Sequence, residues 1–316
     1  AVATASGQAA VTYSVLNLTR AGDNIISIST LYGGTYNLFA HTLPQYGIEV
    51  RWADPDDPDA VARLADDKTR LVFAETIGNP KLNVVDIRAW ADAAHAAGLP
   101  LIVDNTVPTP ILVRPIDYGA DVVVHALTKF LGGHGTTMGG IIIDSGKFPW
   151  TRHAARFPML TEPDESYHGL VDTDHYGPTA YIGRCRSVFQ RAMGSVLSPL
   201  SASLLPQGIE TVALRMARHV ETARRVAEFL RKLMVRFGVE ENRAKEIVAA
   251  GPQVERAKYI KAGQGGGAGL LELDEPFDRA WRRVGLALDR VGFTVEDRDR
   301  SKGYYFVRYL DPALDA

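Results

Sequence analysis

Cysteine is nearly absent from this chain of 316 residues, which contains only Cys185. A single cysteine cannot form a disulfide within the chain, so a disulfide framework is excluded and a reducing cytoplasm fits best. No run of about 18 consecutive apolar residues occurs, so the sequence predicts no membrane span. The opening residues, AVATASGQAAV, lack the basic start of a signal peptide.

An excess of either charge is also missing. The chain has 35 Lys and Arg residues against 37 Asp and Glu residues, which leaves a formal net charge of -2. This balance gives no global case for binding nucleic acid or a membrane surface. His125, His134 and His168 match neither a Cys/His pattern nor HExxH, so no metal site is predicted.

Short apolar runs alternate with helical patterns over the first half of the chain. Buried strands are predicted at 24–29, 48–52, 71–74, 99–103, 122–124 and 138–143. Strands that read as continuous apolar runs between helices are typical of parallel sheets covered on both faces. The sequence therefore predicts an α/β protein with a mostly parallel sheet.

Polar side chains follow three of these strands. Asn79, Asp104 and Lys129 each come just after a separate strand, and the carboxyl ends of parallel strands meet at one edge. An amide, a carboxylate and an amine are the set that pyridoxal phosphate needs. Asn79 can bond the ring hydroxyl, Asp104 can keep the ring nitrogen protonated, and Lys129 can hold the aldehyde as a Schiff base. Taken alone, Lys129 is better explained as a lysine beside a glycine-rich turn. A helix cap is the alternative for Asp104, and the convergence of three polar groups makes the cap the poorer explanation.

Two further stretches can complete such a site. Ser6 is a candidate N-cap of a helix, and Gly7 leaves the first-turn amides open to a cofactor phosphate. Tyr32 lies in a loop after the strand at 24–29, where its ring can stack on a flat cofactor. The alternatives are a plain helix cap for Ser6 and simple packing for Tyr32.

Several runs resemble the Cys/Met-metabolism family of pyridoxal-phosphate enzymes: ATASGQAA, STLYGGTYNLF, AETIGNPKLNV, LIVDNT, HALTKFLGGHG and ARFP. The resemblance extends from Ala1 to about Lys232. Gln8 and the run YGGTYNLF look most like O-acetylhomoserine sulfhydrylase within that family. The resemblance implies the aspartate-aminotransferase-like fold (fold type I), with a seven-stranded sheet, and pyridoxal 5'-phosphate as the cofactor.

The resemblance also implies how the cofactor phosphate is held. The amides of Gly7 and Gln8 would bind it together with Thr128. Ala126 stands where the family usually has serine, which removes one hydroxyl contact worth roughly 1 kcal/mol.

The resemblance also implies the roles of three residues in the reaction. Tyr32 would stack on the cofactor ring and assist proton transfer at the substrate, and Asp104 would pair with the ring nitrogen. Lys129 would be the Schiff-base lysine. The implied reaction is γ-replacement, in which acetate leaves O-acetyl-L-homoserine and sulfide or methanethiol adds. Its products are homocysteine or methionine. The resemblance also implies that the enzyme is a homo-oligomer. Cystathionine γ-synthase and methionine γ-lyase are the alternative activities. The family's N-terminal segment and C-terminal domain do not flank the match, so we expect an incomplete or chimeric copy with little activity.

The sequence divides into four predicted segments. A cofactor-binding large domain is expected at 1–198, a helical connector at 199–261, a Gly-rich linker at 262–269, and a β-α-β-β module at 270–316. From about Lys232 to Pro312 the chain resembles the helix-grip domain of BamC-type outer-membrane assembly lipoproteins. A non-catalytic interaction protein that acts through this tail is therefore the alternative function of another class.

Overall fold

The computed structural model describes residues 1–250, 257–260, 270–273, 277, 280, 281, 284, 293–299 and 304–309. It divides into two compact units, Ala1–Pro252 and Gln253–Ala316. None of the helices among the described residues is long and apolar enough to cross a membrane. The predicted segment boundaries at 198, 261 and 269 stay predictions.

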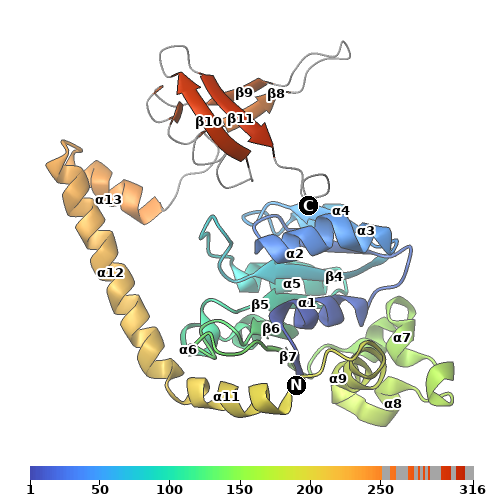
Figure 1. Cartoon of the computed structure of the whole chain (residues 1–316). Helices are drawn as coiled ribbons and strands as arrows, with labels where there is room; N and C mark the ends of the chain where they lie inside the picture. Colours follow the sequence, from blue (N-terminus) through green and yellow to red (C-terminus); the bar gives the residue numbers. More distant parts are fainter. Residues whose placement is uncertain are drawn as a thin grey trace. The chain divides into compact units, whose positions relative to one another are not determined.

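One seven-stranded sheet forms the centre of the first unit, in the order β1-β7-β6-β5-β4-β2-β3 (Figure 1). The strands are β1 (Val2–Thr4), β2 (Asn24–Ile28), β3 (Glu49–Ala53), β4 (Thr69–Glu75), β5 (Leu101–Asp104), β6 (Val122–Ala126) and β7 (Gly140–Asp144). Strands β2 to β6 pair in parallel, whereas β7 is antiparallel to both β6 and β1. The predicted fold, with a mostly parallel seven-stranded sheet, is confirmed, although no strand was predicted at β1.

The apolar runs explain why this sheet is central. Every residue of β2 is buried, and Val122, Val123 and Val124 of β6 are buried in succession. Successive side chains of a strand point to opposite faces, so both faces of these strands are covered. Helix α1 packs on β6 and β7, and α5 packs on β5. The core therefore lies on both sides of the sheet and leaves the strand ends free for polar groups.

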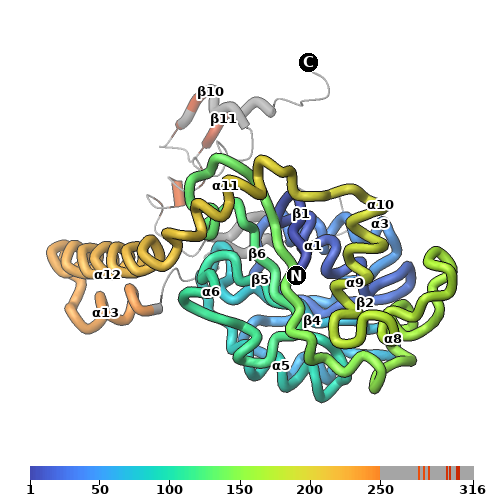
Figure 2. Tube along the Cα trace, turned by 90° about the horizontal axis from the view of Figure 1, so that it is seen from below, coloured from blue at the N-terminus to red at the C-terminus, as the bar shows by residue number. Residues whose placement is uncertain are grey.

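The helices of the first unit vary widely in length. They are α1 (Gly7–Leu16), α2 (Gly33–Asn37), α3 (Leu43–Gln45), α4 (Ala60–Leu64), α5 (Ile87–Ala96), α6 (Thr109–Leu112), α7 (Pro158–Thr161), α8 (Asp172–Tyr176), α9 (Ala180–Arg184), α10 (Arg191–Met193), α11 (Pro199–Glu210), α12 (Val212–Arg236) and α13 (Glu241–Ala250). Short 3-10 or π segments are η1 (Leu38–Thr42), η2 (Pro115–Tyr118), η3 (Trp150–Arg156), η4 (Glu165–Tyr167), η5 (Gly177–Thr179) and η6 (Cys185–Gln190). Figure 2 shows α1 and β1 beside the α9 to α10 segment, where the Gln190 amide donates to the Ala3 carbonyl at 2.6 Å.

The sequence pattern predicts one long helical stretch at 200–230 with a break near Pro206, but the chain changes direction between α11 and α12. Pro206 lies inside α11, which continues to Glu210. The break falls at Thr211, whose backbone N–H donates to the Gly208 carbonyl at 3.3 Å. Helix α12 then runs without interruption to Arg236, and α13 packs against it.

The second unit contains two antiparallel strand pairs among its described residues. Strand β8 (Ala257–Ile260) pairs with β9 (Leu270–Leu273), and β10 (Phe293–Asp299) pairs with β11 (Tyr304–Tyr309). Strand β9 and the β10–β11 hairpin were predicted, but β8 was not. Residues 277, 280, 281 and 284 are helical, as the spacing of the apolar residues predicts. The predicted linker at 262–269 lies outside the described residues.

Candidate active site

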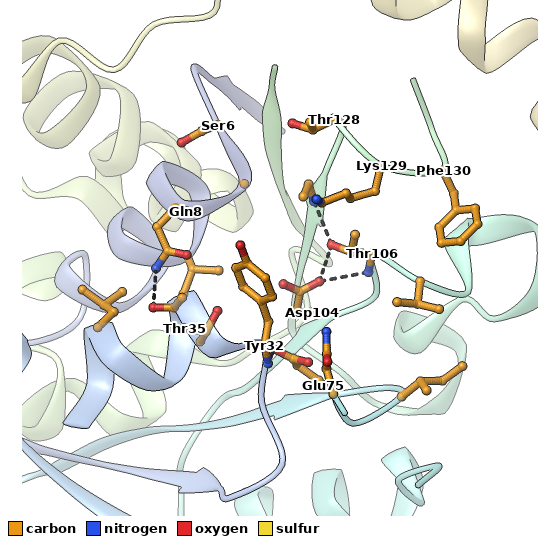
Figure 3. Close-up of a pocket in the computed structure, with 18 of the residues that line it drawn as sticks. Ser6, Gln8, Tyr32, Thr35, Glu75, Asp104, Thr106, Thr128, Lys129 and Phe130 are labelled. Atoms are coloured by element: carbon orange, nitrogen blue, oxygen red, sulfur yellow. Dashed lines mark hydrogen bonds between the residues drawn. The ribbon is translucent and has the colours of Figure 1, made fainter. Parts of the chain in front are cut away.

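A cavity of about 680 Å³ lies at the carboxyl ends of β4, β5 and β6 (Figure 3). All the predicted site residues line it: Ser6, Gly7, Gln8, Tyr32, Asn79, Asp104, Thr128 and Lys129. The structure thus brings together residues that lie more than a hundred positions apart in the sequence, from Ser6 to Lys129. The parallel pairing of β4, β5 and β6 explains this convergence, because it aligns their carboxyl ends.

The first turn of α1 forms one wall of the cavity. Ser6 caps the helix, since its hydroxyl accepts the Ala9 backbone N–H at 3.1 Å. Among the described residues, no acceptor is bonded to the N–H groups of Gly7 or Gln8. A Cβ on Gly7 would lie 2.4 Å from the Cβ of Ala126, so only glycine lets this turn reach the end of β6. Open amides at a helix N-terminus are suited to a phosphate.

Asp104 is the last residue of β5, and Thr106 holds its carboxylate. Thr106 donates its backbone N–H at 2.9 Å and its hydroxyl at 2.5 Å, and both bonds reach Oδ1 of Asp104. The Thr106 hydroxyl in turn accepts the Ala126 backbone N–H at 2.8 Å. Burial raises the pKa of Asp104, while the two bonds from Thr106 oppose that rise. The carboxylate is therefore fixed through one oxygen.

Glu75 is a site residue that sequence reasoning missed. It is the last residue of β4, opposite Asp104 in the parallel register, and its side chain is buried. Its Oε1 accepts the Tyr32 backbone N–H at 2.8 Å. Burial, together with the charge of Asp104, raises the pKa of Glu75 to about 8. Burial beside Asp104 thus favours the protonated form of Glu75 at neutral pH.

Tyr32 is the N-cap residue of α2, and its ring lies between Gln8 and Asp104 (Figure 3). Tyr32 is 49% exposed and lines the cavity. A Cβ on Gly34 would lie 2.6 Å from a carbon of this ring, so the glycine allows Tyr32 to fold against α2. The Gln8 side chain donates to the Gly34 carbonyl at 3.4 Å. The ring therefore presents a flat, partly exposed face to whatever occupies the cavity.

Lys129 follows β6 by three residues and is exposed. It is the only cationic side chain among the described residues that line the cavity. The neighbouring Thr128 hydroxyl bonds both the carbonyl (3.3 Å) and the N–H (3.2 Å) of Gly139, which ties this segment to the approach of β7. Asn79, four residues beyond β4, is exposed and lines the same cavity.

The histidines take no part in the described site. His125 is 2% exposed, and burial lowers its pKa to about 4, so the imidazole is neutral. Within the described ranges, no group of three or more His, Cys, Asp or Glu side chains is arranged to hold a metal ion.

These groups fit a phosphorylated, flat aromatic aldehyde. The open amides of α1 suit its phosphate, the Tyr32 ring suits its flat face, Asp104 suits a ring nitrogen that carries a proton, and Lys129 supplies an amine for its aldehyde. Thr106 was also missed by sequence reasoning, although it stands in the quoted run LIVDNT. A hydroxyl two residues beyond a carboxylate at a strand end is the signal that could have found it.

Comparison with known proteins extends this picture. Residues 1–239 match the family model described as Cys/Met metabolism PLP-dependent enzyme, and residues 261–315 match the outer membrane protein assembly factor BamC-like C-terminal domain. The first match ends beyond Lys232, and the second begins later than predicted. Homocysteine synthase of Schizosaccharomyces pombe is 50% identical over 233 residues, which is 73% of this chain and 54% of that protein. O-acetyl-L-homoserine sulfhydrylase of Leptospira meyeri is 49% identical over 240 residues, with 73% and 54% covered.

A solved structure shares the fold of the first unit. It is a putative O-acetylhomoserine (thiol)-lyase from Campylobacter jejuni that holds N'-pyridoxyl-lysine-5'-monophosphate. It matches with a TM-score of 0.70 and 38% identity over 72% of this chain and 56% of that chain. The chain spans about half the length of the curated relatives it matches. With its family model covering residues 1–239, the chain belongs to the Cys/Met-metabolism family of pyridoxal-phosphate-dependent enzymes.

Proposed function

We propose that the cavity carries out γ-replacement on O-acetyl-L-homoserine, with sulfide or methanethiol as the incoming nucleophile. The observation that carries the proposal is the convergence of Lys129, Asp104 and the first turn of α1 on one cavity, in a chain of this family. The relatives from S. pombe and L. meyeri, a homocysteine synthase and an O-acetyl-L-homoserine sulfhydrylase, support this reaction over other activities of the family.

Pyridoxal phosphate, when bound, supplies an electron sink that stabilises negative charge at the carbons of an amino acid. The residues of this chain have supporting roles in the proposal. The amides of Gly7 and Gln8 and the hydroxyl of Thr128 bind the phosphate. Asp104 holds a proton at the ring nitrogen, and Asn79 bonds the ring hydroxyl.

Two residues handle protons at the substrate in this proposal. The Lys129 amine would hold the cofactor through its aldehyde and, when free, would move protons at the substrate α and β carbons. Tyr32 stacks on the ring and assists that proton transfer with its hydroxyl. Glu75, through the Tyr32 backbone N–H, keeps the loop that bears this ring against the strand ends.

The assay that tests the proposal follows acetate release from O-acetyl-L-homoserine in the presence of pyridoxal phosphate and sulfide. We expect homocysteine to form at a low rate that Lys129→Ala abolishes. The rate is low because the described cavity lining contains no arginine to anchor the substrate carboxylate. Equal rates for the two proteins would contradict the proposal. Cystathionine formed with cysteine would support the synthase alternative, and breakdown of methionine would support the lyase alternative.

A homo-oligomer also forms part of the proposal. Several apolar side chains are exposed in the single chain: Met138, which lines the cavity, at 63%, and Leu82 and Val84 at 62% and 69%. Exposed apolar surface of this kind marks protein interfaces.

The single cysteine, Cys185, is buried and free, which supports a cytoplasmic location.

A further inference from the structure

Arg215 of α12 makes an unusual set of hydrogen bonds with the backbone just after Lys129. Its guanidinium donates to the Phe130 carbonyl at 2.6 Å and the Leu131 carbonyl at 3.2 Å. It also donates to the Gly208 carbonyl at 2.6 Å, at the end of α11. Among the described residues, no carboxylate forms an ion pair with Arg215. Its Nε donates to the Thr211 hydroxyl at 3.1 Å, so the charge is directed at three backbone carbonyls and one hydroxyl.

The turn after Lys129 leaves these carbonyls in need of donors. The Gly132 N–H donates back to Leu127 and the Gly133 N–H donates to Lys129, both at 2.8 Å. Gly133 has a φ of +74°, so the chain turns away there. No described backbone N–H bonds the carbonyl of Phe130 or Leu131. A carbonyl that is partly withdrawn from water needs a donor, and Arg215 supplies one for each of these part-buried bonds.

Close packing accompanies these bonds. A Cβ on Gly133 would lie 2.4 Å from the guanidinium carbon of Arg215, and a Cβ on Gly208 would lie 1.9 Å from the Gly132 carbonyl oxygen. Glycine is therefore required at 208, where the loop backbone approaches, and at 133 the φ of +74° favours glycine. On the apolar side, one small buried cluster joins the loop to these helices through Leu127, Leu131, Leu205, Val212 and Met216.

The ring of Phe130, which lines the cavity, extends this contact one turn further along α12. It meets the His219 ring edge-to-face, with 5.4 Å between the ring centroids. The residue directly after Lys129 is thus held by α12 through both its carbonyl and its side chain.

We propose that Arg215 is a positioning residue that fixes the backbone carrying Lys129, and thereby holds the Lys129 amine in the cavity. The inference rests on the proposed function, because it assigns Lys129 its role. Arginine suits this task because its planar fork reaches the carbonyls of two consecutive residues at once. A lysine ammonium in its place is a single point charge and cannot span them.

The test compares Arg215→Ala and Arg215→Lys with Arg218→Ala, a matched change one turn along α12 at an exposed arginine paired with Glu221. In the cofactor-free protein, hydrogen exchange at the amides of Gly132 and Gly133 should accelerate about tenfold in Arg215→Ala, equivalent to about 1.4 kcal/mol. Exchange in β5 should stay unchanged. Arg215→Lys should lie between wild type and Arg215→Ala, and Arg218→Ala should match wild type.

A second readout uses the protein loaded with pyridoxal phosphate. The pH midpoint of its visible absorption band should move in Arg215→Ala and stay in place in Arg218→Ala. The proposal would be overturned if Arg215→Ala showed the same amide exchange rates at Gly132 and Gly133 as wild type and the same pH midpoint of the absorption band. Equal acceleration in β5 and in the loop would also overturn it, by showing a general loss of stability. If wild type shows no visible band, the proposed function fails, while the exchange measurement still tests the role of Arg215.

Discussion

Replacing Glu75 by glutamine should change how the stability of the cofactor-free protein depends on pH. In the folded chain Glu75 keeps its proton up to a pKa of about 8, against an ordinary value of 4.5. The folded state therefore holds one more proton than the unfolded state between these values, and stability falls as pH rises through this window. The difference between the two pKa values corresponds to a loss of up to about 5 kcal/mol in the free energy of unfolding, at about 1.36 kcal/mol per pH unit. Glutamine is neutral throughout and still offers an oxygen to the Tyr32 N–H.

The assay is urea unfolding of wild type and Glu75→Gln at pH 5 and pH 8. Other groups titrate in this range, including Asp144 and Asp172, whose burial raises each pKa to about 6. Comparing the two proteins removes those shared contributions. From pH 5 to pH 8, we expect the free energy of unfolding to fall by several kcal/mol more in wild type than in Glu75→Gln. Glu49→Gln, at an exposed position on β3, is the control and should follow wild type. Parallel pH curves for wild type and Glu75→Gln would refute the reasoning.

Three further changes test the cavity. Gly7→Ala should weaken retention of pyridoxal phosphate by roughly 2 kcal/mol in equilibrium dialysis, because the added Cβ would lie 2.4 Å from that of Ala126. Thr106→Val should also weaken retention, by about 3 kcal/mol, because Asp104 loses the hydroxyl bond and the Ala126 N–H loses its acceptor. Ala126→Ser should strengthen retention by about 1 kcal/mol through a new hydroxyl beside the first turn of α1. Unchanged affinity in any of the three would show that the altered group lies away from the bound cofactor.

Much of the sheet and the cavity could be predicted because both follow from local patterns. The apolar runs around Ile26, Phe73 and Val123 identify parallel strands, and polar residues that end such runs gather at one edge. Asp104 and Lys129 were found in this way. Their recognition required only strand order and spacing.

The groups that hold these residues could not be predicted, because they act across the fold. Glu75 reads as an ordinary charged residue at a strand end, and its raised pKa depends on the register that places it opposite Asp104. Arg215 bonds the carbonyl of a residue 85 positions earlier, which no local pattern indicates. The break at Thr211 was missed because Pro206 is the stronger local signal, yet the helix continues through it.

The covalent role of Lys129 is the central claim, and borohydride reduction tests it most directly. The protein is incubated with pyridoxal phosphate, reduced with borohydride, digested and analysed by mass spectrometry. We predict a pyridoxyl group on the peptide that contains Lys129, absent in Lys129→Ala and retained in Lys147→Ala, a lysine beyond the end of β7. A label on another lysine, or an unlabelled Lys129 in the wild-type protein, would contradict the account.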